Sequence, residues 1–312
     1  MIDIYVKNEH SKIIKVDDFT EKDCWVKVTA PTRGEINTIV EECDIPVDFL
    51  TDPLDIDERS RIEVDDNATL IVFRASVYDE EIKPLPFYTL PIGIIIRPDK
   101  IITVCSREID FFENFIFDRL KNFSTAKKSR FMLQIFHAST RNYLAYLKLI
   151  KKRIENIEQE FEESHNSESV RKLKNIENNL YPYISSMRGN SIINDRLNRT
   201  NVIEMFDDDE DLLEDVIIDA TQAIEMGNIY MHNIKSLGDY FAAMISNRLN
   251  SVMKFLTSIT IVLMFPTLVA SIFGMNVGLP LENNPIAFTI LMSISFGGSL
   301  LITCLFIKRD WF

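Results

Sequence analysis

The sequence is poor in cysteine and glycine and has no excess of basic residues. Its 312 residues include four cysteines and nine glycines, and 34 lysines and arginines stand against 47 aspartates and glutamates. The cysteines form no CxxC pair and follow no regular spacing, which argues against a disulfide scaffold or a zinc ribbon and favours reduced thiols. The formal charge of −13 argues against a nucleic-acid partner, because such a protein needs a basic face.

Motifs for catalysis and energy coupling are also missing. The sequence contains no Gly-rich phosphate loop and no nucleophile motif, which argues against an enzyme and an ATP-driven pump. Its four histidines have no ligand-like spacing, and we assign them no metal. The first twelve residues lack an apolar signal region, so we expect the large N-terminal part to stay in the cytoplasm.

Charge is nearly absent from the C-terminal part. Between Phe255 and Ile307 the only formally charged residue is Glu282, whereas the first 253 residues carry 45 acidic and 31 basic side chains. The mean hydropathy near zero is therefore an average over an acidic body and an apolar tail. Two apolar runs, Phe255–Phe273 and Ile286–Ile307, approach or exceed the roughly 20 residues that a helix needs to cross a bilayer.

Flanking charges predict how these two spans are oriented. Lys254 precedes the first span, Lys308 and Arg309 follow the second, and the loop between them contains one acid and no base. The positive-inside rule then places both ends of the membrane region in the cytoplasm. We expect a multi-pass protein of the cell membrane with both termini cytoplasmic, embedded in the lipid bilayer.

The soluble part is predicted to begin with an α/β domain and to continue as long helices. Strands are expected at Ile2–Val6, Ile13–Val16, Trp25–Thr29, Thr69–Tyr78, Tyr88–Ile96 and Ile101–Cys105. Helices are expected over Pro31–Cys43 and Arg107–Phe123, and another from Ser167, whose hydroxyl could cap it. The polar stretch Gly189–Asn201 suggests a turn, and a last helix is expected from about Leu212 to Ile272.

These patterns predict a fold class and seven segments. The fold is an α/β N-terminal cytoplasmic domain, a long helical stalk and two C-terminal transmembrane helices. The expected segments are a cytoplasmic α/β domain (1–125), antiparallel long helices (126–205), a stalk helix (206–254), a first span continuous with it (255–273), an outer loop (274–285), a second span (286–307) and a basic tail (308–312).

Polar and small side chains and two methionines recur at steps of three or four along the first span. They are Asn250, Met253, Thr257, Thr260, Met264, Thr267, Ser271 and Gly274. Two interpretations stay open: the hydroxyls bond their own backbone while small residues aid helix packing, or the stripe lines an aqueous path. Two spans cannot enclose such a path, so the second interpretation requires a symmetric ring of copies.

Several short motifs stand out along the chain. They are Asn247-Arg248-Leu249-Asn250, Val252-Met253-Lys254, Leu256-Thr257, Phe265-Pro266, Phe273-Gly274-Met275-Asn276-Val277 and, upstream, Leu54-Asp55, Arg59, Arg61-Ile62-Glu63 and Leu70-Ile71-Val72-Phe73. With these motifs the chain resembles the CorA family of magnesium transport proteins. The Gly-Met-Asn triplet after the penultimate span is the family's signature. The chain departs from the family in having Phe273 where Tyr is usual, and its outer loop has only one acid.

The resemblance implies a homopentameric, funnel-shaped transporter that passes hydrated Mg²⁺ and is gated by intracellular Mg²⁺. Mg²⁺ would thus be both the transported and the regulatory ion. By the same resemblance, selectivity would come from Gly274, Met275 and Asn276, and the pore would be lined by Asn250, Met253, Leu256, Thr260, Met264 and Thr267. Glu282 would attract cations in the outer loop, and Asp79 and Asp215 of neighbouring subunits would bind the regulatory metal.

Mg²⁺ chemistry agrees with these residue types. The ion prefers octahedral oxygen ligands and loses its water reluctantly, so Asn276 amide oxygens could hydrogen-bond its hydration shell. Met253, Leu256 and Met264 would form apolar collars that block ions when narrow. A related transporter of Zn²⁺, Co²⁺ or Ni²⁺, some of them proton-coupled, stays open, as does a non-conducting membrane-anchored sensor. The dipole of a helix N-terminus accounts for the acidic run Asp207–Asp211 without any bound metal.

Overall fold

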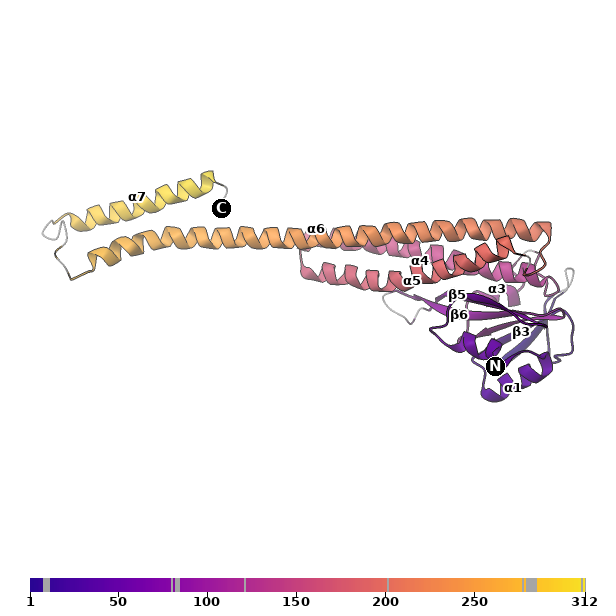
Figure 1. Ribbon diagram of the computed structural model, residues 1–312. Helices are drawn as coiled ribbons and strands as arrows, with labels where there is room; N and C mark the ends of the chain where they lie inside the picture. Colours follow the sequence, from indigo (N-terminus) through magenta and orange to yellow (C-terminus); the bar gives the residue numbers. More distant parts are fainter. Residues whose placement is uncertain are drawn as a thin grey trace. The chain divides into compact units, whose positions relative to one another are not determined.

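The computed structural model describes residues 1–7, 12–79, 81, 85–120, 122–200, 202–276, 278, 285–309 and 311. By their internal contacts these residues form two units, Met1–Gln159 with Arg171–Ser236, and Glu160–Val170 with Leu237–Phe312. The first unit contains the sheet and most of the long helices, and the second contains the apolar helical segments (Figure 1).

The first unit is built on a mixed sheet with the strand order β2-β1-β3-β7-β6-β5-β4. Within the described residues, β3 and β7 pair in parallel, from Cys24 opposite Lys100 to Thr29 opposite Cys105, and the remaining pairs are antiparallel. The strands are β1 (Ile2–Val6), β2 (Ile14–Val16), β3 (Cys24–Thr29), β4 (Arg61–Val64), β5 (Thr69–Tyr78), β6 (Phe87–Ile96) and β7 (Lys100–Cys105).

Short helices cover one face of this sheet. They are α1 (Arg33–Cys43), α2 (Val47–Thr51) and the 3-10 helix η1 (Asp52–Leu54). Helix α1 begins where a capping box forms, because the Thr32 hydroxyl accepts from the Glu35 N–H and the Glu35 carboxylate accepts from the Thr32 N–H. The apolar side of α1, including Ile39, packs with the inward residues of β3 and β7.

Helices that come later in the chain cover the other face. They are α3 (Phe112–Ile116), α4 (Lys128–Ser164), α5 (Ser167–Arg199) and the N-terminal part of α6 (Asp207–Phe273). The buried ring of Trp25 is the centre of this core, 5.0 Å from the ring of Phe131, and its Nε1 donates to the Thr103 hydroxyl at 2.8 Å. An indole N–H that is buried needs such an acceptor, and this one joins β3 to β7, while the ring contact with Phe131 packs the sheet against α4.

All six predicted strands are present, within one residue at each end. Strand β4 was not predicted, because Ile62 and Val64 are its only apolar residues and it lies at the edge of the sheet. The helix predicted over Arg107–Phe123 is wrong, since α3 spans only Phe112–Ile116. Asp118 and Asn122 adopt left-handed backbone conformations, with φ of 54° and 56°, which end helical structure.

The turn predicted at Gly189–Asn201 is also wrong, because α5 continues to Arg199. Tertiary contacts stabilise this polar stretch as a helix: the Asn190 side chain accepts from the Arg74 N–H at 2.9 Å and donates to the Arg74 main-chain oxygen at 2.7 Å. The predicted cap at Ser167 is replaced by Asn166, whose side-chain oxygen accepts from the N–H of Glu168 at 2.7 Å. The last helix was expected from about Leu212, and α6 begins earlier, at Asp207.

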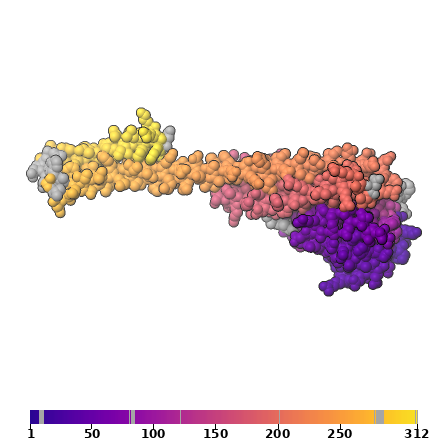
Figure 2. All heavy atoms as spheres, in the orientation of Figure 1, coloured from indigo at the N-terminus to yellow at the C-terminus, as the bar shows by residue number. Residues whose placement is uncertain are grey.

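The second unit contains the apolar part of α6, helix α7 (Ala287–Lys308) and the segment Glu160–Val170, where α4 ends and α5 begins. We call this segment the tip. At the tip, the rings of Phe161 and Phe241 stack with centroids 3.7 Å apart. Helices α6 and α7 each contain a stretch long and apolar enough to cross a membrane. In the space-filling view α7, in yellow, lies along the orange end of α6 (Figure 2).

Candidate functional site

One side of α6 packs against α7 inside the second unit. The Ser258 side chain is completely buried, and the ring of Phe265 lies so close to Gly298 that a Cβ at residue 298 would overlap it. The Ser299 hydroxyl donates to the main-chain oxygen of Val262 at 3.2 Å. Ser258, Val262 and Phe265, at steps of four and three, therefore define the covered face of α6.

The side chains predicted to line a pore lie away from this covered face. A helix turns about 100° per residue, so Thr267, nine residues after Ser258, lies roughly 180° around the helix from it. Met253, Leu256 and Met264 are 53%, 57% and 63% exposed. The whole predicted set is exposed in the single chain: Asn250, Met253, Leu256, Thr260, Met264 and Thr267. We call these six residues the pore face.

Hydroxyl groups on the pore face bond their own helix, as one of the two interpretations expected. Thr260 donates to the main-chain oxygen of Leu256 at 2.8 Å, and Thr267 donates to that of Leu263 at 3.1 Å. Each hydroxyl has one donor and two acceptor positions. With the proton already used, the outward side of Thr260 and Thr267 presents hydrogen-bond acceptors only.

The Gly-Met-Asn triplet follows directly on the end of α6. The N–H of Gly274 still donates to the main-chain oxygen of Ala270 at 2.9 Å, so the backbone extends the helix by one residue beyond Phe273. Met275 and Asn276 are both exposed. The triplet is thus placed at one end of the pore face, and Glu282 lies outside the described residues.

The two predicted regulatory carboxylates belong to different elements of the first unit. Asp79 follows β5, where its N–H donates to the Pro86 main-chain oxygen at 2.8 Å and its carboxylate accepts from the Glu81 N–H at 3.0 Å. Asp215 is exposed on α6. Within the described part of the chain, no group of three or more His, Cys, Asp or Glu residues could hold a metal ion.

The acidic run at the start of α6 contains one buried carboxylate among exposed ones. The side chain of Asp209 is buried, pairs with Arg130 Nη1 of α4 at 3.3 Å, and accepts from the Phe206 N–H at 3.3 Å. Asp207, Asp208 and Glu210 are exposed in the first turn of the helix. Asp209 is thus a structural cap, and the positive end of the helix dipole favours its neighbours.

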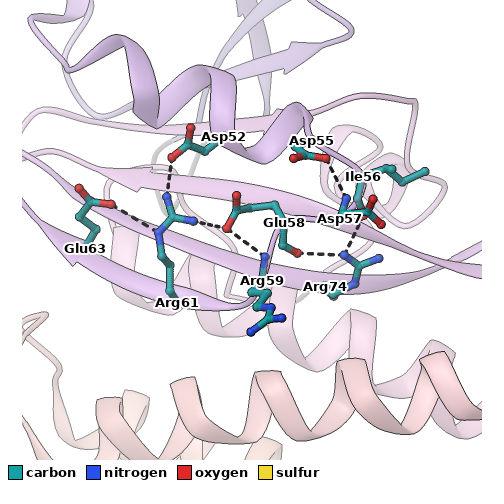
Figure 3. Close-up of polar contacts among 9 residues, drawn as sticks. All are labelled: Asp52, Asp55, Ile56, Asp57, Glu58, Arg59, Arg61, Glu63 and Arg74. Atoms are coloured by element: carbon teal, nitrogen blue, oxygen red, sulfur yellow. Dashed lines mark hydrogen bonds and ion pairs between the residues drawn. The ribbon is translucent and has the colours of Figure 1, made fainter.

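The upstream motif that resembles the family forms a network of charged contacts between η1 and β5 (Figure 3). The Arg61 guanidinium pairs with Asp52, Glu58 and Glu63. Arg74, which sequence patterns did not single out, is enclosed beside it by main-chain oxygens. The polar contacts of this motif stabilise the loop between η1 and β4 and do not form an ion site.

Two further residues of the site were missed because they lie on α7. Gly298 provides the space that the Phe265 ring occupies, and Ser299 supplies a hydrogen bond to α6. The run Gly297-Gly298-Ser299 is the one signal that could have found them, because small residues often mark close helix contacts in membranes.

Together the fold and the site define a class: a membrane protein with a large sheet-and-helix domain and two apolar C-terminal helices, one of which carries an exposed, partly polar face. A family described as "CorA-like Mg2+ transporter protein" matches residues 21–309. The chain therefore belongs to the CorA-like family, and the resemblance noted in its motifs is confirmed.

Characterised relatives agree with this assignment over nearly the whole chain. The chain is 25% identical to the cobalt/magnesium transport protein CorA of Methanocaldococcus jannaschii over 95% of both sequences. It is 23% identical to the protein of the same description from Thermotoga maritima, over 81% of this chain and 72% of the relative. The complete structure of the M. jannaschii CorA magnesium transporter has the same fold, with a TM-score of 0.86, 23% identity and coverage of 100% and 99%.

Proposed function

We propose that this chain is a subunit of a homopentameric Mg²⁺ transporter that passes the hydrated ion along the pore faces of α6. The observation that carries this proposal is the geometry of α6. One side is covered by α7, while the pore face, which carries two threonines, an asparagine, a leucine and two methionines, is exposed to solvent within the described residues. A symmetric ring of copies would bring these faces together around one axis.

The chemistry of the pore face suits a hydrated cation. Water bound to Mg²⁺ points its hydrogens outward, and Mg²⁺ gives up this water reluctantly. Thr260 and Thr267 present acceptors to such water because their protons are already donated to the helix. Asn276, at the end of the helix, would add a ring of amide oxygens. The side chains of Met253, Leu256 and Met264 would form apolar collars that close the path when they meet.

The orientation proposed for the membrane region follows from charge. Lys254 stands at one end of the first apolar segment, and Lys308 and Arg309 stand at the end of the second. By the positive-inside rule these ends face the cytoplasm, and the Gly-Met-Asn triplet faces outside. Mg²⁺ would then enter at Asn276 and move toward Asn250, driven by the membrane potential.

Regulation by intracellular Mg²⁺ is proposed to use Asp79 of one subunit and Asp215 of its neighbour. The exposed position of Asp215 and the finding that neither residue belongs to a group of three or more metal-ligating side chains within the described residues support a site shared between copies. Two bare carboxylates repel each other, and a bound Mg²⁺ would join them. If the metal binds the closed arrangement better than the open one, high internal Mg²⁺ favours the closed state.

A second candidate is transport of another divalent metal. The names of both relatives include cobalt as well as magnesium, which favours Co²⁺ as a second ion. The pore face contains no histidine or cysteine, the ligands that soft divalent metals prefer, and this favours Mg²⁺ over Zn²⁺.

Ion-resolved flux tests the proposal. Protein reconstituted in liposomes is expected to carry Mg²⁺ without a proton gradient, and flux of Co²⁺, Ni²⁺ and Zn²⁺ under the same conditions distinguishes the alternatives. Asn276→Ala should abolish Mg²⁺ flux while the oligomer still assembles. Asn178→Ala, on the exposed side of α5, is the matched control and should keep the native rate. Selective flux retained by Asn276→Ala would refute the selectivity role.

A further inference from the structure

Proline 266 interrupts the hydrogen bonding of α6 in the middle of its apolar segment. Helix α6 continues through Pro266 to Phe273. A proline has no N–H, so the main-chain oxygen of the residue four positions earlier, Val262, loses its helical donor. In the interior of a membrane an unpaired oxygen of this kind is costly, because no water is available to replace the donor.

The second apolar helix supplies the missing donor. Ser299 Oγ, on α7, donates to the main-chain oxygen of Val262 at 3.2 Å. This is not where a helical serine hydroxyl usually bonds in these segments. Five other hydroxyls donate to the oxygen four residues back on their own helix: Ser258, Thr260, Thr267, Ser293 and Thr303. Ser299 instead bonds across to α6, at the one oxygen that the proline leaves without its helical donor.

A second contact holds the helices together at the same level. The ring of Phe265, the residue before the proline, lies against Gly298, the residue before Ser299. The absence of a side chain at residue 298 therefore lets the two backbones approach. The close approach and the hydrogen bond act on consecutive residues of both helices, so they fix α6 at its proline.

We propose that Ser299 is a positioning residue for the transport path: its hydroxyl replaces the donor that Pro266 lacks and so fixes the part of α6 that presents Met264 and Thr267. The reference to a transport path rests on the proposed function. Met264 and Thr267 flank Pro266 and point away from α7. A loss of the Ser299 bond would free their backbone while leaving every pore-face side chain unchanged.

A double-mutant cycle between residues 299 and 266 tests this inference. Ser299→Ala should lower the thermal stability of the purified protein and reduce Mg²⁺ flux per assembled oligomer about fivefold, the effect of one hydrogen bond. In Pro266→Ala the new N–H can bond to Val262, so adding Ser299→Ala should change neither quantity further. Ser299→Thr, which keeps a hydroxyl, should restore both.

Ser293→Ala is the matched control. It removes a hydroxyl from the same helix, but that hydroxyl donates only to its own Thr289 oxygen, at 2.8 Å. It should leave stability and flux at native values in both backgrounds. Equal losses from Ser299→Ala with and without Pro266, or no loss in either, would overturn the inference. A native protein that carries no divalent ion would instead overturn the proposed function, since the stability cycle reports on the hydrogen bond alone.

Discussion

Arg74 on β5 donates a hydrogen bond from Nη1 to the main-chain oxygen of Glu58, at 2.9 Å, in the loop that precedes β4 (Figure 3). The same nitrogen donates to the main-chain oxygen of Ile56 at 2.8 Å, and Nε donates to the Ser186 hydroxyl of α5 at 3.2 Å. One guanidinium thus ties a strand, a loop and a helix of the first unit together.

Replacing Arg74 by lysine is expected to destabilise the first unit. A lysine ammonium keeps the charge but donates from a single nitrogen and cannot reach all these acceptors at once. We expect a loss of about 2 kcal/mol, measured as a lower midpoint of thermal unfolding. Arg59→Lys is the control, because the Arg59 guanidinium has no partner within the described residues. Equal midpoints for the two variants would contradict the prediction.

Replacing Gly297 or Gly298 of α7 by alanine tests whether α6 and α7 pack closely at residue 298, since both substitutions change helix propensity alike. The methyl group of Gly298→Ala would overlap the Phe265 ring, whereas the methyl group of Gly297→Ala would have no atom within 4 Å. Overpacking of this kind costs about 1–3 kcal/mol, so Gly298→Ala should lower thermal stability and Gly297→Ala should not. The measurement is thermal unfolding in detergent. Two variants of equal stability would show that the helices do not meet at this residue in the assembled protein.

Removal of the proposed regulatory carboxylates should weaken inhibition by internal Mg²⁺. Asp79→Asn combined with Asp215→Asn removes the charges that would bind the ion, so half-inhibition should require about tenfold more internal Mg²⁺. Flux from liposomes loaded with graded Mg²⁺ measures the shift, with the rate at low internal Mg²⁺ as the reference. Asp208→Asn, exposed at the start of the same helix, is the control. An unchanged dependence of flux on internal Mg²⁺ would contradict the hypothesis of a site shared between subunits.

Stability should fall at alkaline pH partly because of Cys105. Burial raises the pKa of its thiol from 9.0 to about 12. The folded protein therefore holds this proton more tightly than the unfolded chain, and the contribution to stability is complete below about pH 9 and decreases as pH rises toward 12. Between pH 8 and pH 10.5, the free energy of unfolding should fall by about 2 kcal/mol less in Cys105→Ala than in the native protein.

Thermal unfolding over this pH range measures the difference in slope. Cys304→Ala, which removes an exposed thiol, should keep the native slope. Parallel slopes for all three proteins would show that the buried thiol does not titrate on unfolding. The absolute stability of Cys105→Ala is not diagnostic, since removing a buried side chain also leaves a small cavity.

Sequence patterns located most strands because apolar runs bounded by polar residues are local signals. Strand β5 has the same bounds, Thr69–Tyr78, as its prediction. The failures occurred where distant contacts determine the structure. The polar stretch after Gly189 is helical because Asn190 bonds to the backbone of Arg74, and no local pattern contains that information.

The same contrast applies to the candidate site. The stripe along the first apolar segment was visible in the sequence because its residues recur at helical spacing, whereas the six residues of the pore face were inferred from the family resemblance and stay a prediction. Ser299 could not be predicted, because α7 is apolar on nearly all sides and shows no stripe to indicate which face meets α6. A proline at residue 266 leaves the Val262 oxygen without its helical donor, but only the packed structure identifies the group that replaces it.

The position of β7 in the sheet constrains the order in which the chain can fold during synthesis. Strand β3 finds its parallel partner only when Cys105 has been made, and the core on one face of the sheet stays incomplete until the buried Val216 of α6 is available. The first apolar segment begins only after another 38 residues, 217–254. The ribosome can thus release a nearly complete first unit before membrane insertion begins, so its aromatic core need not compete with the bilayer for apolar side chains.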